Sequence, residues 1–243
     1  MDIAIKRDYR IVEPSAPYPR RENRQGRNTQ LVRLVNRPGV RLFRNHYHLI
    51  KRVFDVTVCV LLLPFALLIM GVCALFIWLN DPGPVFFAQN RTGKGGRRFQ
   101  MFKFRTMVTN AEELKVRYAH LNELTAPDFK ITDDPRVTRV GRILRKTSLD
   151  EVPQIFNVLK GDMSLVGPRP TSFDVSTYDL WHTERLEVLP GITGLWQIKG
   201  RSDLDFDDRL RLDIEYIERQ SIWLDILILF RTATAVVKQR GAY

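Results

Sequence analysis

Two adjacent carboxylates, Asp150 and Glu151, lie in the stretch of the chain best suited to chemistry, TSLDEVPQIFNVLKGDMSLVGPRP over residues 147–170. An ionised aspartate can attack phosphorus as a nucleophile and form an acyl phosphate. A neighbouring glutamate offers a hard oxygen to Mg2+, which binds through one or two carboxylates together with substrate phosphates. The pair is therefore suited to phosphoryl transfer, with Asp150 as nucleophile or metal ligand and Glu151 as metal ligand.

Basic residues lie near this pair, and Lys103, Arg105 and Arg145 among them are candidates for phosphate binding. Four of them precede it in the sequence: Lys103, Arg105, Arg145 and Lys146. We expect their charges to lower the pKa of Asp150 and to keep it ionised. Arg169 lies between Pro168 and Pro170 in the GPRP motif. Because both prolines restrict the local backbone, this guanidinium is predicted to be held rigidly for a bidentate phosphate contact.

A purely structural role for the acidic pair is the alternative. The apolar spacing i, i+3, i+4, i+7 predicts a helix over residues 150–160, defined by Val152, Ile155, Phe156 and Leu159. Gly161 is its expected end. Ser148 and Glu151 form a capping box, but Pro153 fits the first turn better if Asp150 is the N-cap. Helix physics alone favours Asp150 as the cap.

A basic series precedes the acidic pair. Its arginines recur every three residues, at Arg136, Arg139, Arg142 and Arg145. This spacing predicts one basic side of a helix, with Val137, Val140 and Leu144 on the buried side. The basic side is either a solvated surface or a stripe that binds phosphate or lipid headgroups, and the spacing does not distinguish the two.

The elements that must position these residues are a short hairpin and several helices. Residues 83–107 predict two short strands joined by a turn at Gly93–Gly96. This turn lacks the Walker spacing, and no G-x-G-x-x-G follows a strand. Residues 109–124 and 207–218 are predicted helices. The fold class that follows is α+β: a mainly helical catalytic domain with a small β-hairpin.

A long apolar segment indicates contact with a membrane. Val53–Leu79 contains 27 residues, of which only Asp55, Thr57, Pro64 and Gly71 are not apolar. About 20 apolar residues span a bilayer, so the segment is long enough to insert. A buried core helix is the alternative, although so long a run that is apolar on all sides is rare in soluble domains.

The flanks of this segment favour a re-entrant helix hairpin over a span. Basic residues lie on both sides, from Lys51 and Arg52 before it to Arg105 after it, whereas the positive-inside rule predicts a one-sided bias for a span. Pro64 can bend the segment into arms of about 11 and 15 residues, each too short to cross a core of about 30 Å. We therefore expect a hairpin that enters and leaves one leaflet.

Three regions are predicted: a basic, poorly ordered arm over residues 1–45, the membrane segment over 46–80, and a cytosolic catalytic domain over 81–243. The net charge is +11, and residues 1–52 hold 13 Lys or Arg against 4 Asp or Glu. Such a basic arm suits an anionic surface, either nucleic acid or acidic lipid. The apolar C-terminal helix could lie at the membrane interface with Trp223 as an anchor, or equally belong to the core.

Four blocks of the chain resemble the bacterial sugar transferase family, the monotopic phosphoglycosyl transferases. They are KRVFD (51–55), DPGPVFFAQNRTGKGGRRFQMFKFRTM (81–107), DPRVTRVGRILRKTSLDEVPQIFNVLKGDMSLVGPRP (134–170) and LPGITGLWQIKGRSDLDFDDRLRLDIEYI (189–217). The resemblance runs from about Lys51 to the C-terminus and leaves the basic arm uncovered. The last block is most similar to exopolysaccharide-initiating members.

This resemblance implies a reaction and a set of roles. The reaction would transfer a sugar 1-phosphate from a UDP-sugar to polyprenyl (undecaprenyl) phosphate, releasing UMP. Asp150 would be the nucleophile that forms a covalent phosphosugar intermediate, with Glu151 on Mg2+. Further basic positions match phosphate-handling motifs, namely Lys103, Arg105 and Arg169. Pro64 would mark the break of the re-entrant helix, where the family commonly has Ser-Pro and this chain has Leu-Pro.

The expected location is the bacterial inner membrane, with the catalytic domain on the cytoplasmic face. The expected partners are the donor, the acceptor and membrane lipids, without nucleic acid; a homodimer is the assembly considered. The alternative is a membrane-anchored basic protein that binds acidic lipid or nucleic acid without catalysis, motivated by the +9 charge of the first 52 residues.

Overall fold

The computed structural model describes residues 44–123, 131–174, 180–199 and 206–237. The predicted basic arm lies outside these residues apart from its last two positions, so its disorder stays a prediction.

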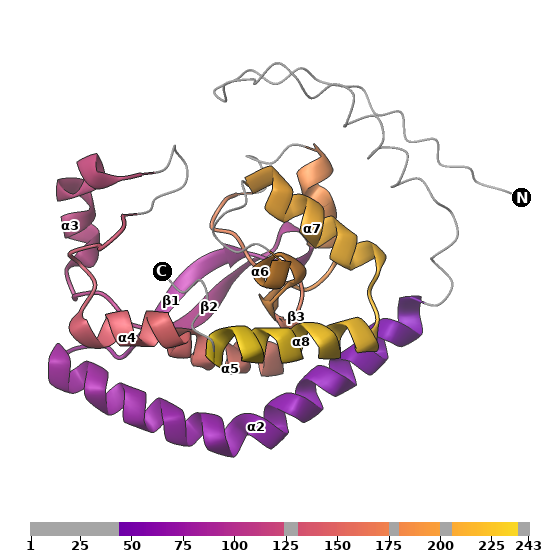
Figure 1. Ribbon diagram of the computed structural model, residues 1–243, viewed down its shortest axis with the longest axis horizontal. Coiled ribbons are helices and arrows are strands. Elements are labelled where there is room, and N and C mark those ends of the chain that lie inside the picture. Colours follow the sequence, from indigo (N-terminus) through magenta and orange to yellow (C-terminus); the bar gives the residue numbers. More distant parts are fainter. Residues whose placement is uncertain (1–43, 124–130, 175–179, 200–205, 238–243) are drawn as a thin grey trace, which may run out of the picture. The chain divides into compact units, whose positions relative to one another are not determined.

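The described part of the chain is a mixture of helices and two small sheets, which confirms the α+β class (Figure 1). The helices are α2 (Arg44–Asn80), α3 (Ala111–Arg117), α4 (Arg139–Thr147), α5 (Ile155–Lys160), α6 (Leu195–Lys199), α7 (Phe206–Glu218) and α8 (Ile222–Val237). The strands are β1 (Phe86–Thr92), β2 (Arg98–Phe104), β3 (Ser164–Val166) and β4 (Gly191–Thr193). Short 3-10 turns connect them at Lys94–Gly96, Ala119–Leu121, Leu149–Gln154 and Leu180–Glu187.

The predicted hairpin is present as β1 and β2. The strands pair antiparallel, from Phe86 opposite Phe104 to Thr92 opposite Arg98. The turn between them needs a left-handed backbone at Gly95, with φ of 64°, which glycine adopts without steric cost. The C-terminal half of β2 carries Lys103 and is followed directly by Arg105.

The second sheet brings two distant loops together. Strands β3 and β4 pair in parallel, with Ser164 opposite Gly191 and Val166 opposite Thr193. A Cβ atom on Gly191 would lie 2.1 Å from the backbone nitrogen of Gly167. Only glycine permits so close an approach, and it places the GPRP loop after β3 directly against the chain leading into β4.

Helix α2 is a single helix of 37 residues that includes Pro64. From Tyr47 to Asn80 it is long and apolar enough to cross a membrane, with a hydropathy of 2.9 in its most apolar window. Figure 1 shows it bent near its middle, in keeping with the helix hydrogen bond that a proline removes. Because the chain does not break into two helices here, the predicted hairpin stays a prediction.

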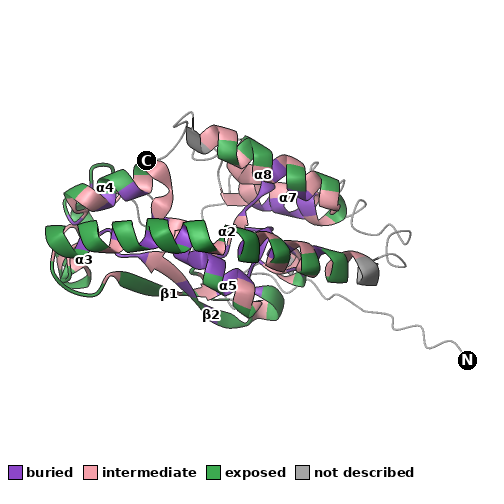
Figure 2. Ribbon diagram, turned by 90° about the horizontal axis from the view of Figure 1, so that it is seen from below, coloured by how far each residue is buried: buried purple, intermediate pink, exposed green. Residues whose placement is uncertain are grey.

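One side of α2 packs on the rest of the structure and the other side is exposed. The packed side is a stripe of Lys51, Asp55, Cys59, Ala66, Met70, Cys73 and Ile77. Its length is roughly 40 Å at the helical rise of about 1.5 Å per residue. The opposite side exposes large apolar residues, including Leu61, Phe65 and Leu68, and Figure 2 shows this exposed surface along the helix. Such an extended apolar surface is typical of a membrane contact.

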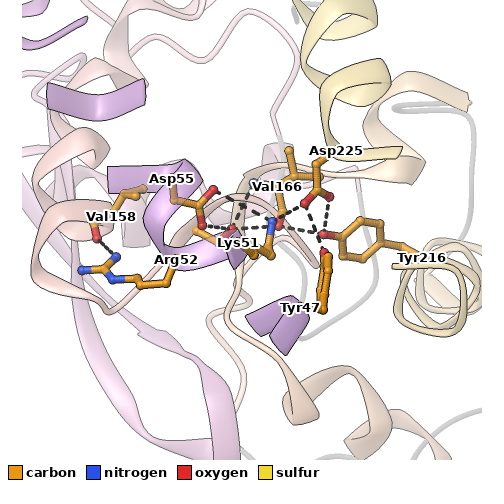
Figure 3. Close-up of polar contacts among 9 residues, drawn as sticks. Tyr47, Lys51, Arg52, Asp55, Val158, Val166, Tyr216 and Asp225 are labelled. Atoms are coloured by element: carbon orange, nitrogen blue, oxygen red, sulfur yellow. Dashed lines mark hydrogen bonds and ion pairs between the residues drawn. The ribbon is translucent and has the colours of Figure 1, made fainter. Parts of the chain in front are cut away.

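A buried polar cluster joins the start of α2 to α7 and α8 (Figure 3). Lys51 Nζ lies 2.7 Å from Asp225 Oδ2 of α8, and Tyr216 of α7 donates to Asp225 Oδ1 at 2.7 Å. Asp55 accepts a hydrogen bond of 2.7 Å from Ser164 of β3. The cluster explains the charged residues of a helix that is otherwise apolar, because each of them has a partner in the domain.

Helix α8 packs in the core on one side and exposes apolar residues on the other, so it combines the two positions that its sequence allowed. Asp225 and Ile228 are fully buried, whereas Trp223 and Phe230 are 75% and 68% exposed. The helix therefore contributes one side to the core and presents aromatic residues on the other.

Candidate active site

The acidic pair lies in a 3-10 turn, Leu149–Gln154, and α5 begins only at Ile155. Ser148 precedes the turn with φ of 57° and ends α4, and its side chain does not cap the following helix. Both capping predictions are therefore wrong: neither the Ser148 nor the Asp150 side chain is a helix cap. Pro153 lacks the N–H that a regular helix needs, and the tighter turn accommodates it. The predicted end at Gly161 is confirmed, in the left-handed conformation.

The turn is held against strand β2 by Asn157, a fully buried residue of α5. Its Oδ1 accepts from the backbone N–H of Phe102 at 2.9 Å, and its Nδ2 donates to the carbonyl of Gln100 at 2.7 Å. On the other side of α5, Arg52 of α2 donates to the carbonyls of Val158 and Leu159 at 2.5 and 2.9 Å. Helix α5, which follows the acidic pair, is thus fixed both to the β1–β2 hairpin and to α2.

Two basic residues converge on Glu151. Lys103 Nζ lies 2.8 Å from Glu151 Oε1 and 3.7 Å from Asp150 Oδ2. Arg169 NH2 pairs with the same Oε1, and its NH1 donates to Oε2 at 3.3 Å. The structure therefore brings together four predicted site residues from three separate segments: Lys103 on β2, the pair on its turn, and Arg169 on the GPRP loop.

The two carboxylates differ in their pKa. Burial would raise the pKa of Glu151, but Arg169 and Lys103 outweigh it and hold this pKa well below its usual range. For Asp150 burial is the largest influence and raises the pKa, with Lys103 opposing and Glu151 reinforcing the rise. The expectation that basic neighbours would lower the pKa of Asp150 is therefore wrong in direction, because desolvation exceeds their effect.

Arg145 lies near the pair without pairing with it. Its Nε donates to Thr106 Oγ1 at 2.9 Å, and burial lowers the pKa of Arg145 while Asp150 acts in the opposite direction. The approach of α4 that makes this contact depends on Gly141, where a Cβ atom would lie 2.0 Å from the carbonyl oxygen of Thr106. Arg145 thus adds a third positive charge to the surroundings of Asp150.

The predicted basic side of α4 is not a single stripe. Arg136 precedes the helix and is buried, with its Nε 2.9 Å from Asp134 Oδ1. Arg139 and Arg142 are exposed, whereas Arg145 turns inward. Leu144 is buried as predicted. The four arginines therefore have three different surroundings. Arg136 forms a buried ion pair, Arg139 and Arg142 are exposed at the surface, and Arg145 lies near the acidic pair.

Arg105 and Pro64 do not join the site. Arg105 NH1 lies 3.3 Å from Asp81 Oδ2, and its NH2 donates to the carbonyl of Asp81, so this side chain fastens the end of β2 to the residue after α2. Pro64 is exposed near the middle of α2. A phosphate-binding role for Arg105 stays a prediction without support from its contacts.

Behind the GPRP loop lies an ion pair that the sequence did not indicate. Pro168 and Pro170 are buried on either side of Arg169. Arg185 NH2 donates to the carbonyl of Arg169 at 2.5 Å and lies 2.7 Å from Asp213 Oδ2 of α7. The three residues are separated by 16 and 28 positions along the chain and belong to no recognisable motif, so no signal in a single sequence could have paired them.

A pocket of about 150 Å3 adjoins the acidic pair through Arg169. Its walls include the aromatic rings of Phe173, Trp196 and Phe206 and the charged groups of Arg185, Arg209 and Asp213. Arg169 and Pro170 are the lining residues that were predicted for the site. The others were missed, because they come from separate segments that only the tertiary fold brings together.

The carboxylates meet the needs of a Mg2+ ion that also binds substrate. Among the described residues, no group of three or more His, Cys, Asp or Glu could hold a metal by itself. A Mg2+ ion needs only one or two carboxylates if phosphates complete its shell. The ionised, half-buried carboxylate of Glu151 with Asp150 beside it fits that pattern.

Comparisons with known proteins match most of the chain. Residues 46–239 match the family described as bacterial sugar transferase. The chain is 46% identical over 206 residues to the galactosyl transferase CpsE of Streptococcus agalactiae, covering 82% of this chain and 45% of CpsE. It is 42% identical over 227 residues to undecaprenyl-phosphate galactose phosphotransferase of Salmonella typhimurium, covering 88% of this chain and 45% of that protein.

A shorter relative matches over most of its length. The exopolysaccharide production protein ExoY of Sinorhizobium fredii is 40% identical over 202 residues, which is 79% of this chain and 88% of ExoY. The chain thus spans about half the length of the first two relatives and nearly all of the third.

Proposed function

Because the chain belongs to the bacterial sugar transferase family, we propose that it transfers a sugar 1-phosphate from a UDP-sugar to undecaprenyl phosphate, initiating exopolysaccharide or other glycoconjugate assembly. One observation carries the proposal: the buried Asp150 and the half-buried Glu151 are surrounded by basic side chains beside a long, exposed apolar helix. The basic side chains are those of Lys103, Arg145 and Arg169. This arrangement combines a nucleophile, phosphate-binding cations and a lipid-facing surface.

In the first step, a carboxylate oxygen of Asp150 attacks the sugar-bearing phosphorus of the donor. The bond between this phosphorus and the bridging oxygen breaks, and UMP leaves with that oxygen and the electron pair. The product is an acyl phosphate that links Asp150 to the sugar 1-phosphate. Lys103 and Arg169, which pair with Glu151 in the free protein, are placed to bind the oxygens of the diphosphate.

In the second step, a phosphate oxygen of the polyprenyl acceptor attacks the same phosphorus. The acyl phosphate bond breaks, Asp150 leaves as a carboxylate, and a polyprenyl diphosphosugar is formed. Glu151 would hold a Mg2+ ion, which would screen the charge of the donor's diphosphate and stabilise the charge on the UMP that departs in the first step. No water enters either step, which distinguishes the transferase from a phosphatase.

The contacts of α2 support insertion into one leaflet. At its start Arg52 bonds to carbonyls of α5, and at its end Asn80 accepts from the N–H of Val140 on α4 at 3.2 Å. Both ends therefore contact the same domain, which a straight span cannot do, because its two ends emerge on opposite sides of the bilayer. We place the domain at the cytoplasmic face of the inner membrane. A homodimer stays a prediction.

The proposal is tested by UMP release from UDP-sugars in the presence of Mg2+ and undecaprenyl phosphate. Asp150→Asn should abolish release and the covalent adduct seen by mass spectrometry, because an amide does not form the acyl phosphate. Asp162→Asn, which removes only a carboxylate paired with the exposed Lys160, should retain activity. Full turnover by Asp150→Asn would contradict the assignment. Activity that survives deletion of residues 1–40 would argue against the basic-binding alternative.

A further inference from the structure

The pocket beside Arg169 has the features of a site for one planar ring. Arg169 lines it and also pairs with Glu151, so a ligand that fills the pocket extends directly to the acidic pair. Its volume of about 150 Å3 is below the roughly 300–1,000 Å3 of pockets that enclose a whole drug-sized ligand. The pocket therefore suits a part of the donor rather than all of it.

The walls of the pocket are aromatic and cationic. Phe173 and Phe206 lie edge to face, with ring centroids 5.6 Å apart at 71°. The guanidinium of Arg209 lies over the Trp196 ring at 5.7 Å and over the Phe206 ring at 5.9 Å. Flat π surfaces of this kind bind a nucleobase by stacking, whereas phosphate gains nothing from them.

The polar end of the pocket contains a buried acceptor. Asp213 is 1% exposed, and its Oδ2 lies 2.7 Å from Arg185 NH2. Its Oδ1 is buried and receives no hydrogen bond from the described residues. A buried carboxylate oxygen without a donor is costly to retain, and a ligand N–H that reached it would remove the cost.

We propose that this pocket binds the uracil ring of the donor, with the ring against Trp196 and Phe206 and its N3–H donated to Asp213. This inference rests on the proposed function. The carbonyl groups that flank N3 on uracil are acceptors, which the guanidiniums of Arg185 and Arg209 can satisfy. Cytosine presents a lone pair at N3 and is disfavoured beside a carboxylate. A hexose lacks the flat π face that the aromatic walls match.

Binding of UMP and CMP to the detergent-solubilised full-length protein, measured by calorimetry, tests the inference without requiring turnover. The wild type should bind UMP at least tenfold more tightly than CMP. Asp213→Asn should lose most of this preference, because an amide can donate to N3 of cytosine as well as accept from uracil. The matched control is Asp208→Asn, on the same helix but outside the pocket and paired with Arg211. It should keep both affinities.

Asp213→Asn leaves Arg185 without its buried partner and could unfold the protein. Trp196→Leu is the second variant, because it removes a stacking surface and leaves the ion pair intact. It should weaken UMP binding by about tenfold or more. Unchanged UMP binding in Trp196→Leu would overturn the uracil site while leaving the transferase intact. A wild type that binds UMP but catalyses no transfer would overturn the transferase instead.

Discussion

At the residue scale, the surroundings of the two carboxylates shift their pKa values in opposite directions. Glu151 is bound by Lys103 and Arg169, and its pKa is lowered despite burial. Asp150 lies 3.7 Å from Lys103, and burial raises its pKa. A nucleophile with a raised pKa is more basic when ionised, and a metal ligand with a lowered pKa stays anionic. The two neighbouring carboxylates thus suit different roles, Asp150 as nucleophile and Glu151 as metal ligand.

This difference predicts a pH dependence. Asp150 must be ionised to attack phosphorus, so the rate should rise with pH through the pKa of Asp150, which burial raises above its usual range. Lys103 is the largest influence that lowers this pKa. Lys103→Met should therefore raise it further and move the acid limb of the kcat profile to higher pH.

The matched control for this shift is Lys146→Met, which removes an exposed lysine of α4. Its acid limb should coincide with that of the wild type. If the acid limb of the kcat profile of Lys103→Met stayed in place or moved to lower pH, a group other than Asp150 would control the rate.

At the element scale, short polar contacts hold helix α2 on the domain. Asp225 of α8 is fully buried and accepts from Tyr47 at 3.1 Å, from Lys51 at 2.7 Å and from Tyr216 at 2.7 Å (Figure 3). Arg52, one residue further along α2, bonds to the carbonyls that end α5. The same end of α2 therefore contacts both the C-terminal helix and the helix that follows the acidic pair.

Asp225→Asn should lower the free energy of unfolding by about 3–5 kcal/mol, because it leaves the buried Lys51 cation without a compensating charge. Thermal unfolding in detergent, followed by circular dichroism, measures the change. Glu215→Gln is the control, because its ion pair with the exposed Arg219 is at the surface and such pairs contribute about 0–1 kcal/mol. Equal effects of the two substitutions would show that the buried cluster is not a determinant of stability.

At the scale of the whole molecule, α2 is long enough to cross a bilayer, yet both of its ends contact the same domain. The buried stripe from Lys51 to Ile77 covers roughly 40 Å of the helix. The domain therefore packs along most of α2 and not only against one of its ends. The exposed apolar residues lie on the other side of the same helix, with further ones on α8. A lipid-facing surface beside the acidic pair would bring the polyprenyl acceptor and the soluble donor to the same site.

This arrangement predicts that both ends of α2 are cytoplasmic. Single cysteines at Leu49 and Pro82, which are both exposed, should react with a membrane-impermeant maleimide only after cells are opened. Buried Cys59 and Cys73 should remain unlabelled in the folded protein. If either engineered cysteine reacted in intact cells, the helix would span the membrane and the re-entrant proposal would fail.

The sequence by itself determined the features that depend on local pattern. Alternation, hydropathy and glycine act over a few residues. They were enough to predict the β1–β2 hairpin, the long apolar helix, α7 and the end of α5 at Gly161. The acidic pair and its basic neighbours followed from residue type, and the family followed from their order along the chain. Two of the predicted phosphate ligands bond to other partners, Arg105 to Asp81 and Arg145 to Thr106.

The tertiary structure alone decided what depends on burial and on distant partners. The pKa of Asp150 rises because desolvation exceeds the effect of its cationic neighbours, and no count of nearby charges gives that balance. The 3-10 turn replaced the expected helix cap because Ser148 ends α4. The pocket, with its Arg185–Asp213 pair, is built from segments far apart in the chain, and their contact is a property of packing that a single sequence does not record.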